Sequence, residues 1–115
     1  MTQICIGTWA WGNKLVWGYK SQRDDELLKE TFNQAIKGGL NLIDTADSYG
    51  TGLNTGRSEV LIGQFIQELP TKQIKNLLIA TKLAPFPWRI GRSGMKRAFL
   101  ASKNRLKGHI HRVQL

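Results

Sequence analysis

Two largely apolar segments of the chain each lead into a charged side chain. Residues 40–43 precede Asp44, and residues 77–79 are followed by Ala80, Thr81 and then Lys82. Short apolar runs of this kind, which do not alternate regularly with polar positions, are typical of strands in a parallel sheet that is covered on both faces. The pattern therefore predicts two buried strands, one ending at Asp44 and one ending at Lys82.

Amphipathic segments separate the predicted strands. Between residues 27 and 36 the apolar positions share one face of a helix, and Gly38 and Gly39 end it. The expected elements are a strand at residues 4–7, a helix capped by Asp24 or Asp25, the strand ending at Asp44, a helix capped by Ser58 and stopped by Pro70, the strand ending at Lys82, a loop at residues 83–92, a helix from Ser93 to Leu106 and a strand starting near Val113. The order βαβαβαβ indicates an α/β fold with a parallel sheet, and residues 1–115 show no linker or repeat, so they form one domain or part of one.

Ionisable side chains gather where the predicted strands end. In a βα architecture the carboxyl ends of parallel strands meet at one edge of the sheet, where the loops build ligand sites. Asp44 and Lys82 can pair there, and Tyr49 follows Asp44 by five residues. The ammonium of Lys82 would favour the phenolate form of Tyr49 and make its hydroxyl a better proton donor near neutral pH. A purely structural ion pair between Asp44 and Lys82 is the alternative interpretation.

Several motifs in this order resemble the aldo/keto reductase family. They are Gly39-x-Asn41-x-Ile43-Asp44-Thr45-Ala46-Asp47-Ser48-Tyr49-Gly50, then Ser58-Glu59-x-x-Ile62-Gly63, then Ala80-Thr81-Lys82, preceded by Gly7-Thr8-Trp9. The resemblance implies a (β/α)8 TIM barrel that reduces aldehydes or ketones with NADPH, through a tetrad of Asp, Tyr, Lys and His. By matching position it implies Asp44, Tyr49 and Lys82 as catalytic residues, Gly7, Thr8 and Asp44 as cofactor contacts, and Trp9 and Tyr49 as contacts to a small carbonyl substrate.

The fourth residue of the tetrad has no match. In the family the histidine follows the next strand, whereas this sequence stops at Leu115, where that strand would be starting. His109 and His111 precede the strand and are expected at its amino end, so we assign neither of them the role. A (β/α)8 barrel needs about 250 residues, and we therefore expect the first half of a barrel, open at both edges.

An open half-barrel has two expected consequences. We expect a truncated reductase that is inactive on its own, because the histidine and most of the cofactor site would come from later strands. We also expect self-association through the open sheet edges. The alternative is a non-enzymatic basic binding or pairing module derived from such a half-barrel.

Composition bears on where in the cell the protein is expected. Hydrophobic residues make up 41% of the chain, yet no run approaches the ~20 apolar residues of a membrane span. We predict no secretion signal, because the amino terminus lacks a basic region followed by an apolar one, and no metal site. Cys5 is the only cysteine and is expected to be an inert core thiol. These features favour a cytoplasmic protein.

Charge is distributed unevenly along the chain. The net charge is +9, and residues 69–115 contain eleven Lys or Arg and no Asp or Glu. Such asymmetry is a known footprint of nucleic-acid binding. We do not expect a nucleic-acid partner, however, because no recognised binding module or stacking pattern of aromatic residues accompanies the basic residues. A basic surface also attracts the phosphates of a nicotinamide cofactor.

Overall fold

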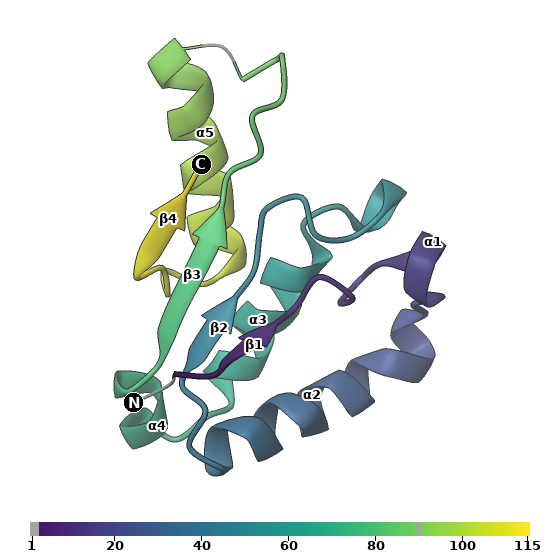
Figure 1. The fold of residues 1–115 in the computed structure, drawn as a ribbon, viewed down its shortest axis with the longest axis vertical. Coiled ribbons are helices and arrows are strands. Elements are labelled where there is room, and N and C mark those ends of the chain that lie inside the picture. The colour runs from purple at the N-terminus through teal and green to yellow at the C-terminus, as the bar shows by residue number, and fades with distance from the viewer. Residues whose placement is uncertain (1–2, 90) are drawn as a thin grey trace.

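Four parallel strands form a single sheet in the computed structural model, which describes residues 3–89 and 91–115. The elements in chain order are β1 (Cys5–Gly7), α1 (Lys14–Trp17), α2 (Ser21–Lys37), β2 (Leu42–Asp44), the 3-10 helix η1 (Gly52–Asn54), α3 (Arg57–Gln67), α4 (Thr71–Lys75), β3 (Leu78–Lys82), α5 (Gly91–Arg105) and β4 (Arg112–Gln114). The order of strands across the sheet is β1-β2-β3-β4, so each strand lies beside the next one in the chain (Figure 1). The predicted α/β fold is confirmed.

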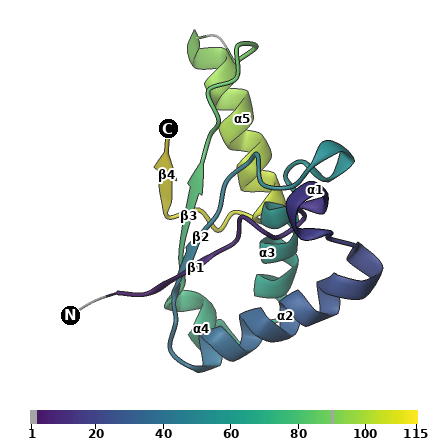
Figure 2. The same cartoon turned by 45° about the vertical axis from the view of Figure 1, so that its right-hand side comes forward.

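The sheet is open and only one of its faces is covered by helices. Figure 2 shows α2, α3 and α5 on the same side of the four strands. Within the described residues, β1 pairs only with β2, and β4 pairs only with β3. This is the arrangement expected for consecutive βα units of a barrel that has not closed.

Side chains of the strands alternate between a buried and an accessible face. Ile43 and Ile79 point toward the helices and are fully buried, whereas Leu78 is 43% exposed and Cys5 is exposed. The prediction that both faces are covered was therefore wrong, and so was the assignment of Cys5 to the core. Apolar residues at these positions reflect a face that a closed barrel would bury in its interior.

The core lies between the sheet and the helices. Trp11, Phe32 and Phe65 form a cluster in which the ring centroids are 5.6 to 6.4 Å apart. Phe32 comes from α2 and Phe65 from α3, so this cluster holds the two helices against each other and behind β1 and β2. Aromatic contacts of this kind stabilise a packed core beyond the burial of area alone.

Two predicted helix starts differ from the observed ones. Helix α2 begins at Ser21, because the carboxylate of Asp24 accepts a hydrogen bond from the backbone N–H of Lys20, at 2.8 Å, from inside the first turn. Helix α3 begins at Arg57 after Gly56, which adopts a left-handed φ of 82°. Ser58 is therefore inside the helix and does not cap it, because its hydroxyl binds the strands instead.

The remaining differences concern short elements and loop ends. Helix α3 ends at Gln67, and Pro70 starts the short helix α4, which the sequence pattern did not predict, like α1 and η1. Helix α5 begins at Gly91 and ends at Arg105, so the loop before it is shorter than predicted; Ile90, in that loop, lies outside the described residues. Helices of three to five residues carry too few turns to show a periodic pattern.

Candidate active site

Asp44 and Lys82 are brought to one edge of the sheet by the register of β2 and β3. Asp44 pairs with Ala80, and Lys82 lies two residues further along β3. Because side chains alternate along a strand, Ala80 and Lys82 point to the same face of the sheet. The side chain of Lys82 can therefore reach back to Asp44 on the accessible face.

The ammonium group of Lys82 connects the three predicted catalytic residues. Its Nζ donates hydrogen bonds to Oδ1 of Asp44 at 2.8 Å and to the backbone oxygen of Thr45 at 2.9 Å. The same atom lies 3.4 Å from the hydroxyl of Tyr49 and 5.2 Å from the centroid of its ring. The structure thus brings Asp44, Tyr49 and Lys82 together at the carboxyl ends of the strands, and their catalytic roles stay a prediction.

Lys82 is held in its charged form. Partial burial lowers the pKa of Lys82, but the hydrogen bond and the charge of Asp44, together with Tyr49, outweigh it and raise the pKa above its ordinary value. Asp44 and Lys82 each keep 35% of their side-chain surface exposed. A positive charge beside the Tyr49 hydroxyl is therefore present throughout the physiological pH range and is accessible to a ligand.

A buried network of hydroxyl groups lies behind this site. Ser58 donates a hydrogen bond to Oγ1 of Thr8 at 2.7 Å and shares another with Oγ1 of Thr45 at 3.0 Å. Thr8 in turn donates to the backbone oxygen of Asp44 at 3.0 Å. All three hydroxyl residues are fully buried, so helix α3 is bound directly to the ends of β1 and β2.

A buried carboxylate continues the network toward β3 and α5. Oε1 of Glu59 accepts a hydrogen bond from the hydroxyl of Thr81 at 2.5 Å, and Oε2 accepts one from Nε of Arg105 at 2.7 Å. The side chain of Glu59 has no exposed surface. In the sequence, Glu59 was singled out only as part of the Ser58-Glu59-x-x-Ile62-Gly63 motif. The signal that could have found its structural role is a Ser-Glu pair at the start of an otherwise apolar helix face.

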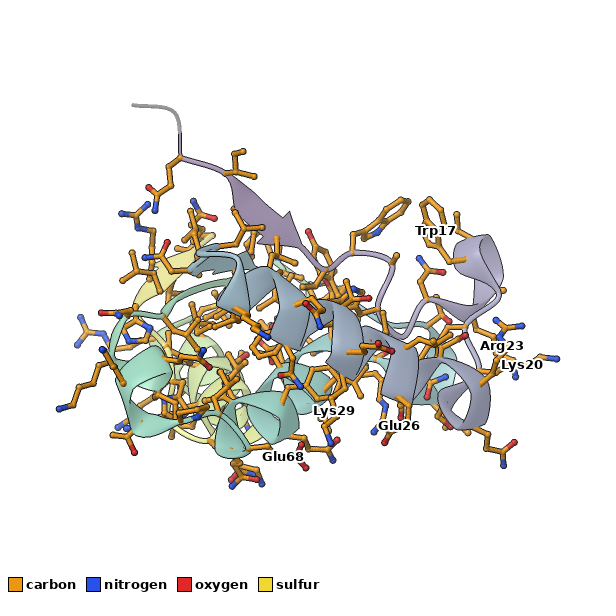
Figure 3. All side chains as sticks on the ribbon, turned by 90° about the horizontal axis from the view of Figure 1, so that it is seen from below. Trp17, Lys20, Arg23, Glu26, Lys29 and Glu68 are labelled. Carbon is orange, nitrogen blue, oxygen red and sulfur yellow. The ribbon has the colours of Figure 1, made fainter. Side chains whose placement is uncertain are left out.

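The predicted cofactor and substrate contacts near β1 differ in accessibility. Gly7 is exposed and pairs with Asp44 across the sheet. Thr8 is fully buried, and both its hydroxyl and its backbone N–H donate to the backbone oxygen of Asp44, so neither group is free to contact a ligand in this arrangement. Trp9 is half exposed and contacts the ring of Trp17 edge to face, with the ring centroids 6.1 Å apart; Figure 3 shows Trp17 at the rim of the molecule on α1. Their roles in binding also stay predictions.

The histidines lie at the opposite end of the sheet. Nδ1 of His111 accepts a hydrogen bond from the backbone N–H of Ile79 at 3.0 Å, and the backbone N–H of His111 donates to the oxygen of Ile79 at 2.9 Å. Ile79 is near the amino end of β3, whereas Lys82 is its last residue. His111 is thus near the amino ends of β3 and β4, as predicted, and away from Tyr49.

Over residues 3–89 and 91–115, no three His, Cys, Asp or Glu side chains come together in a way that could hold a metal ion. Among the helices of the same residues, none has both the length and the apolar character needed to cross a bilayer.

Comparison with known proteins adds independent evidence. The profile of the aldo/keto reductase family matches residues 3–114. The chloroplastic pyridoxal reductase of Arabidopsis thaliana is 49% identical over 105 residues, which are 89% of this chain and 28% of the relative. The NADH-specific methylglyoxal reductase of Escherichia coli is 36% identical over 74 residues, which are 64% of this chain and 21% of the relative.

A solved structure from Pseudomonas aeruginosa, described as an aldo-keto reductase, superimposes with a TM-score of 0.66 at 26% identity, covering 90% of this chain and 38% of that one. The chain thus spans less than two fifths of the length of these relatives. Both curated relatives are reductases by name. The family profile extends over all four strands and includes Asp44, Tyr49 and Lys82. The chain belongs to the aldo/keto reductase family.

Proposed function

We propose that this chain supplies the proton-donating part of a carbonyl reductase site. The observation that carries the proposal is the position of the Lys82 ammonium, 2.8 Å from Asp44 and 3.4 Å from the hydroxyl of Tyr49. A phenol beside a permanent cation can release its proton to a substrate oxygen more readily than an isolated phenol can. The same three side chains stand at the edge of the sheet where ligands of such folds bind.

The proposed reaction reduces an aldehyde or ketone to an alcohol. A reduced nicotinamide, when bound, supplies the hydride that adds to the carbonyl carbon. Tyr49 donates its proton to the carbonyl oxygen, which becomes the hydroxyl of the product, and Lys82 stabilises the phenolate that remains. Asp44 holds Lys82 in place through their hydrogen bond. Solvent then returns a proton to Tyr49.

The described residues fit part of a nicotinamide cofactor. No atom lies within 4 Å of the position that a Cβ on Gly7 would occupy, so open space adjoins the end of β1 beside Asp44. A flat ring can approach the backbone closely there, because glycine presents no side chain. We expect NADPH rather than NADH, although the Escherichia coli relative is named as NADH-specific.

Pyridoxal is the aldehyde that we propose to test first, because the Arabidopsis relative at 49% identity is a pyridoxal reductase by name. A cytoplasmic location stays a prediction, since the same relative is named as chloroplastic.

The test uses a complete barrel made by joining residues 1–115 to the remaining part of the Arabidopsis relative. Tyr49→Phe should abolish NADPH-dependent reduction of pyridoxal, and Lys82→Met should lower kcat about 10²–10⁴-fold, as loss of general acid catalysis does. Tyr19→Phe and Lys103→Met serve as controls, because both residues lie away from the site, and they should retain turnover. Turnover near that of the parent in both Tyr49→Phe and Lys82→Met would show that the proton donor lies elsewhere.

A further inference from the structure

Asp47 is a buried carboxylate that the proposed chemistry does not use. It lies in the loop between Asp44 and Tyr49, and its side chain has no exposed surface, whereas Asp44 and Lys82 are each 35% exposed. A buried charge is retained only where it is paired and hydrogen-bonded, because its desolvation is costly. The contacts of Asp47 therefore indicate what it does.

Both oxygens of Asp47 bind the loop that follows β3. Oδ1 accepts a hydrogen bond from the backbone N–H of Ala84 at 3.1 Å, and Oδ2 accepts one from Nη1 of Arg89 at 2.5 Å. Nη1 of Arg89 also donates to the oxygen of Ala84 at 2.8 Å, and the guanidinium lies 4.9 Å from the ring centroid of Phe86. The side chain thus closes the loop after β3 onto the loop after β2; Figure 1 shows both loops rising from the carboxyl ends of their strands.

The backbone of Asp47 makes a second connection, directly at the site. Its N–H donates to the backbone oxygen of Lys82 at 3.0 Å. Asp47 therefore binds the chain at Lys82 and again at Ala84, on either side of a single residue. On its own loop, Tyr49 follows two residues later, where the N–H of Tyr49 bonds to the oxygen of Ala46 at 3.2 Å and closes a tight turn.

We propose that Asp47 is a positioning residue that, with Arg89 as its counter-ion, sets the separation between the Tyr49 hydroxyl and the Lys82 ammonium. Tyr49 lies in the loop after β2, whereas Lys82 is the last residue of β3, directly before the next loop, and the Tyr49 hydroxyl and the Lys82 ammonium are 3.4 Å apart. Asp47 is the residue that ties these loops together through both its backbone and its side chain. The consequence of Asp47 for catalysis rests on the proposed function. The separation between the Tyr49 hydroxyl and the Lys82 ammonium can be tested without turnover.

The chain allows a direct measurement, since it contains only two tyrosines, Tyr19 and Tyr49. In a Tyr19→Phe background, the near-ultraviolet absorbance of the phenolate follows Tyr49 alone. Partial burial lowers the pKa of Lys82, but the hydrogen bond and the charge of Asp44 raise it above its ordinary value. An ammonium near a phenol favours the phenolate form, so a change in the midpoint between variants reports a change in the separation of the two groups.

Substitution of Asp47 distinguishes an effect on the position of Lys82 from the direct effect of the Asp47 charge on Tyr49. Removing a negative charge near a phenol would by itself lower the midpoint, whereas moving Lys82 away from the phenol raises it. We expect Asp47→Ala to raise the midpoint, because displacement of the ammonium from the phenol outweighs the loss of a more distant carboxylate. Asp24→Ala, which removes a partly exposed carboxylate outside the site, is the matched control and should leave the midpoint unchanged.

An unchanged or lowered midpoint in Asp47→Ala would overturn the inference. If that variant does not fold by circular dichroism, Asp47→Asn carries the test, because it keeps the shape of the side chain and a rise in its midpoint again requires loss of position. The variant Lys82→Met distinguishes a failure of the positioning role of Asp47 from a failure of the proposed Tyr49–Lys82 pair. A shift in Lys82→Met without one in the Asp47 variants removes only the positioning role, and no shift in any of them removes the Tyr49–Lys82 pair as well.

Discussion

At the scale of single residues, Asp24 shows how a partly exposed carboxylate can set a local structure. Its Oδ1 accepts a hydrogen bond from Nε of Arg23 at 2.7 Å, and its Oδ2 accepts one from the backbone N–H of Lys20 at 2.8 Å. These bonds, that of Arg23 foremost, lower the pKa of Asp24 to about 2. The ionised carboxylate thus satisfies a free N–H at the start of α2, where a negative charge is also favoured by the helix dipole.

The depressed pKa of Asp24 predicts a pH-dependent contribution to stability. Because the folded-state pKa lies below the unfolded value of 3.8, the stabilisation is present above pH 3.8 and is lost as the pH falls through about 2. We expect Asp24→Asn to have a lower urea midpoint than the parent at neutral pH, and the same midpoint near pH 2. A difference between the two proteins that stays constant with pH would show that the charge is not responsible.

At the scale of elements, Glu59 is the buried link between α3, β3 and α5. It binds Thr81 on the strand that ends in Lys82, and Arg105 at the end of α5. Gly63, one turn later on α3, permits this contact, because a Cβ there would lie 2.2 Å from the backbone oxygen of Arg105. Helix α5 therefore approaches α3 closely, and the approach depends on a missing side chain and a buried ion pair.

Loss of this link should destabilise the fold substantially. Glu59→Gln leaves Arg105 without its counter-ion, and breaking a buried pair costs about 3 kcal/mol or more in the free energy of unfolding. Glu68→Gln is a matched control, because Glu68 pairs with Lys29 at 2.5 Å but is 57% exposed (Figure 3). An exposed pair contributes at most about 1 kcal/mol. Equal losses in the two variants, measured by urea denaturation, would contradict the role of Glu59.

At the scale of the whole molecule, the open sheet leaves apolar side chains exposed along its edges and its uncovered face. Ile4 before β1 is 64% exposed, Leu78 on β3 is 43% exposed and Val113 on β4 is 38% exposed. Unpaired strand edges of this kind bind other strands readily. The net charge of +9 opposes association between copies, but physiological salt screens it beyond about 8 Å.

We therefore expect a polypeptide of these 115 residues to form dimers or larger assemblies in sedimentation equilibrium at physiological salt. Val113→Lys should weaken the association, because a charge on an edge strand disfavours pairing. Leu53→Lys, at a fully exposed position on η1, is the matched control and should not weaken it. A folded monomer of 13.0 kDa with a cooperative melt would contradict this prediction.

The same polypeptide should show no measurable carbonyl reduction. Its described strands place Tyr49, Lys82 and Asp44 at an edge that stays open to solvent, while His111 is bonded to Ile79 at the far end of the sheet. Cofactor positioning, which is most of what a protein contributes to hydride transfer, would be incomplete. Oxidation of NADPH with para-nitrobenzaldehyde that Tyr49→Phe abolishes would refute the prediction.

The sequence by itself was sufficient for the order of the four strands and the three long helices, and for the meeting of Asp44, Tyr49 and Lys82. Local sequence patterns predict the strands, because each short apolar run ends at a charged residue. Parallel βα units then bring the carboxyl ends of these strands to one edge of the sheet. The start of a helix is less certain from sequence, as Ser21 and Arg57 show, because a carboxylate inside the first turn or a glycine before it can take over the role of a cap.

Only the tertiary structure decided which face of the sheet is covered and which polar residues are buried. Cys5 and Leu78 look like core residues in the sequence, but they lie on the face that has no helix. Glu59 and Asp47 look like surface residues, yet their partners are Arg105, 46 residues away, and Arg89, 42 residues away. Such contacts leave no local pattern, because their free energy depends on the desolvation and pairing that packing brings about, and not on neighbouring residues in the chain.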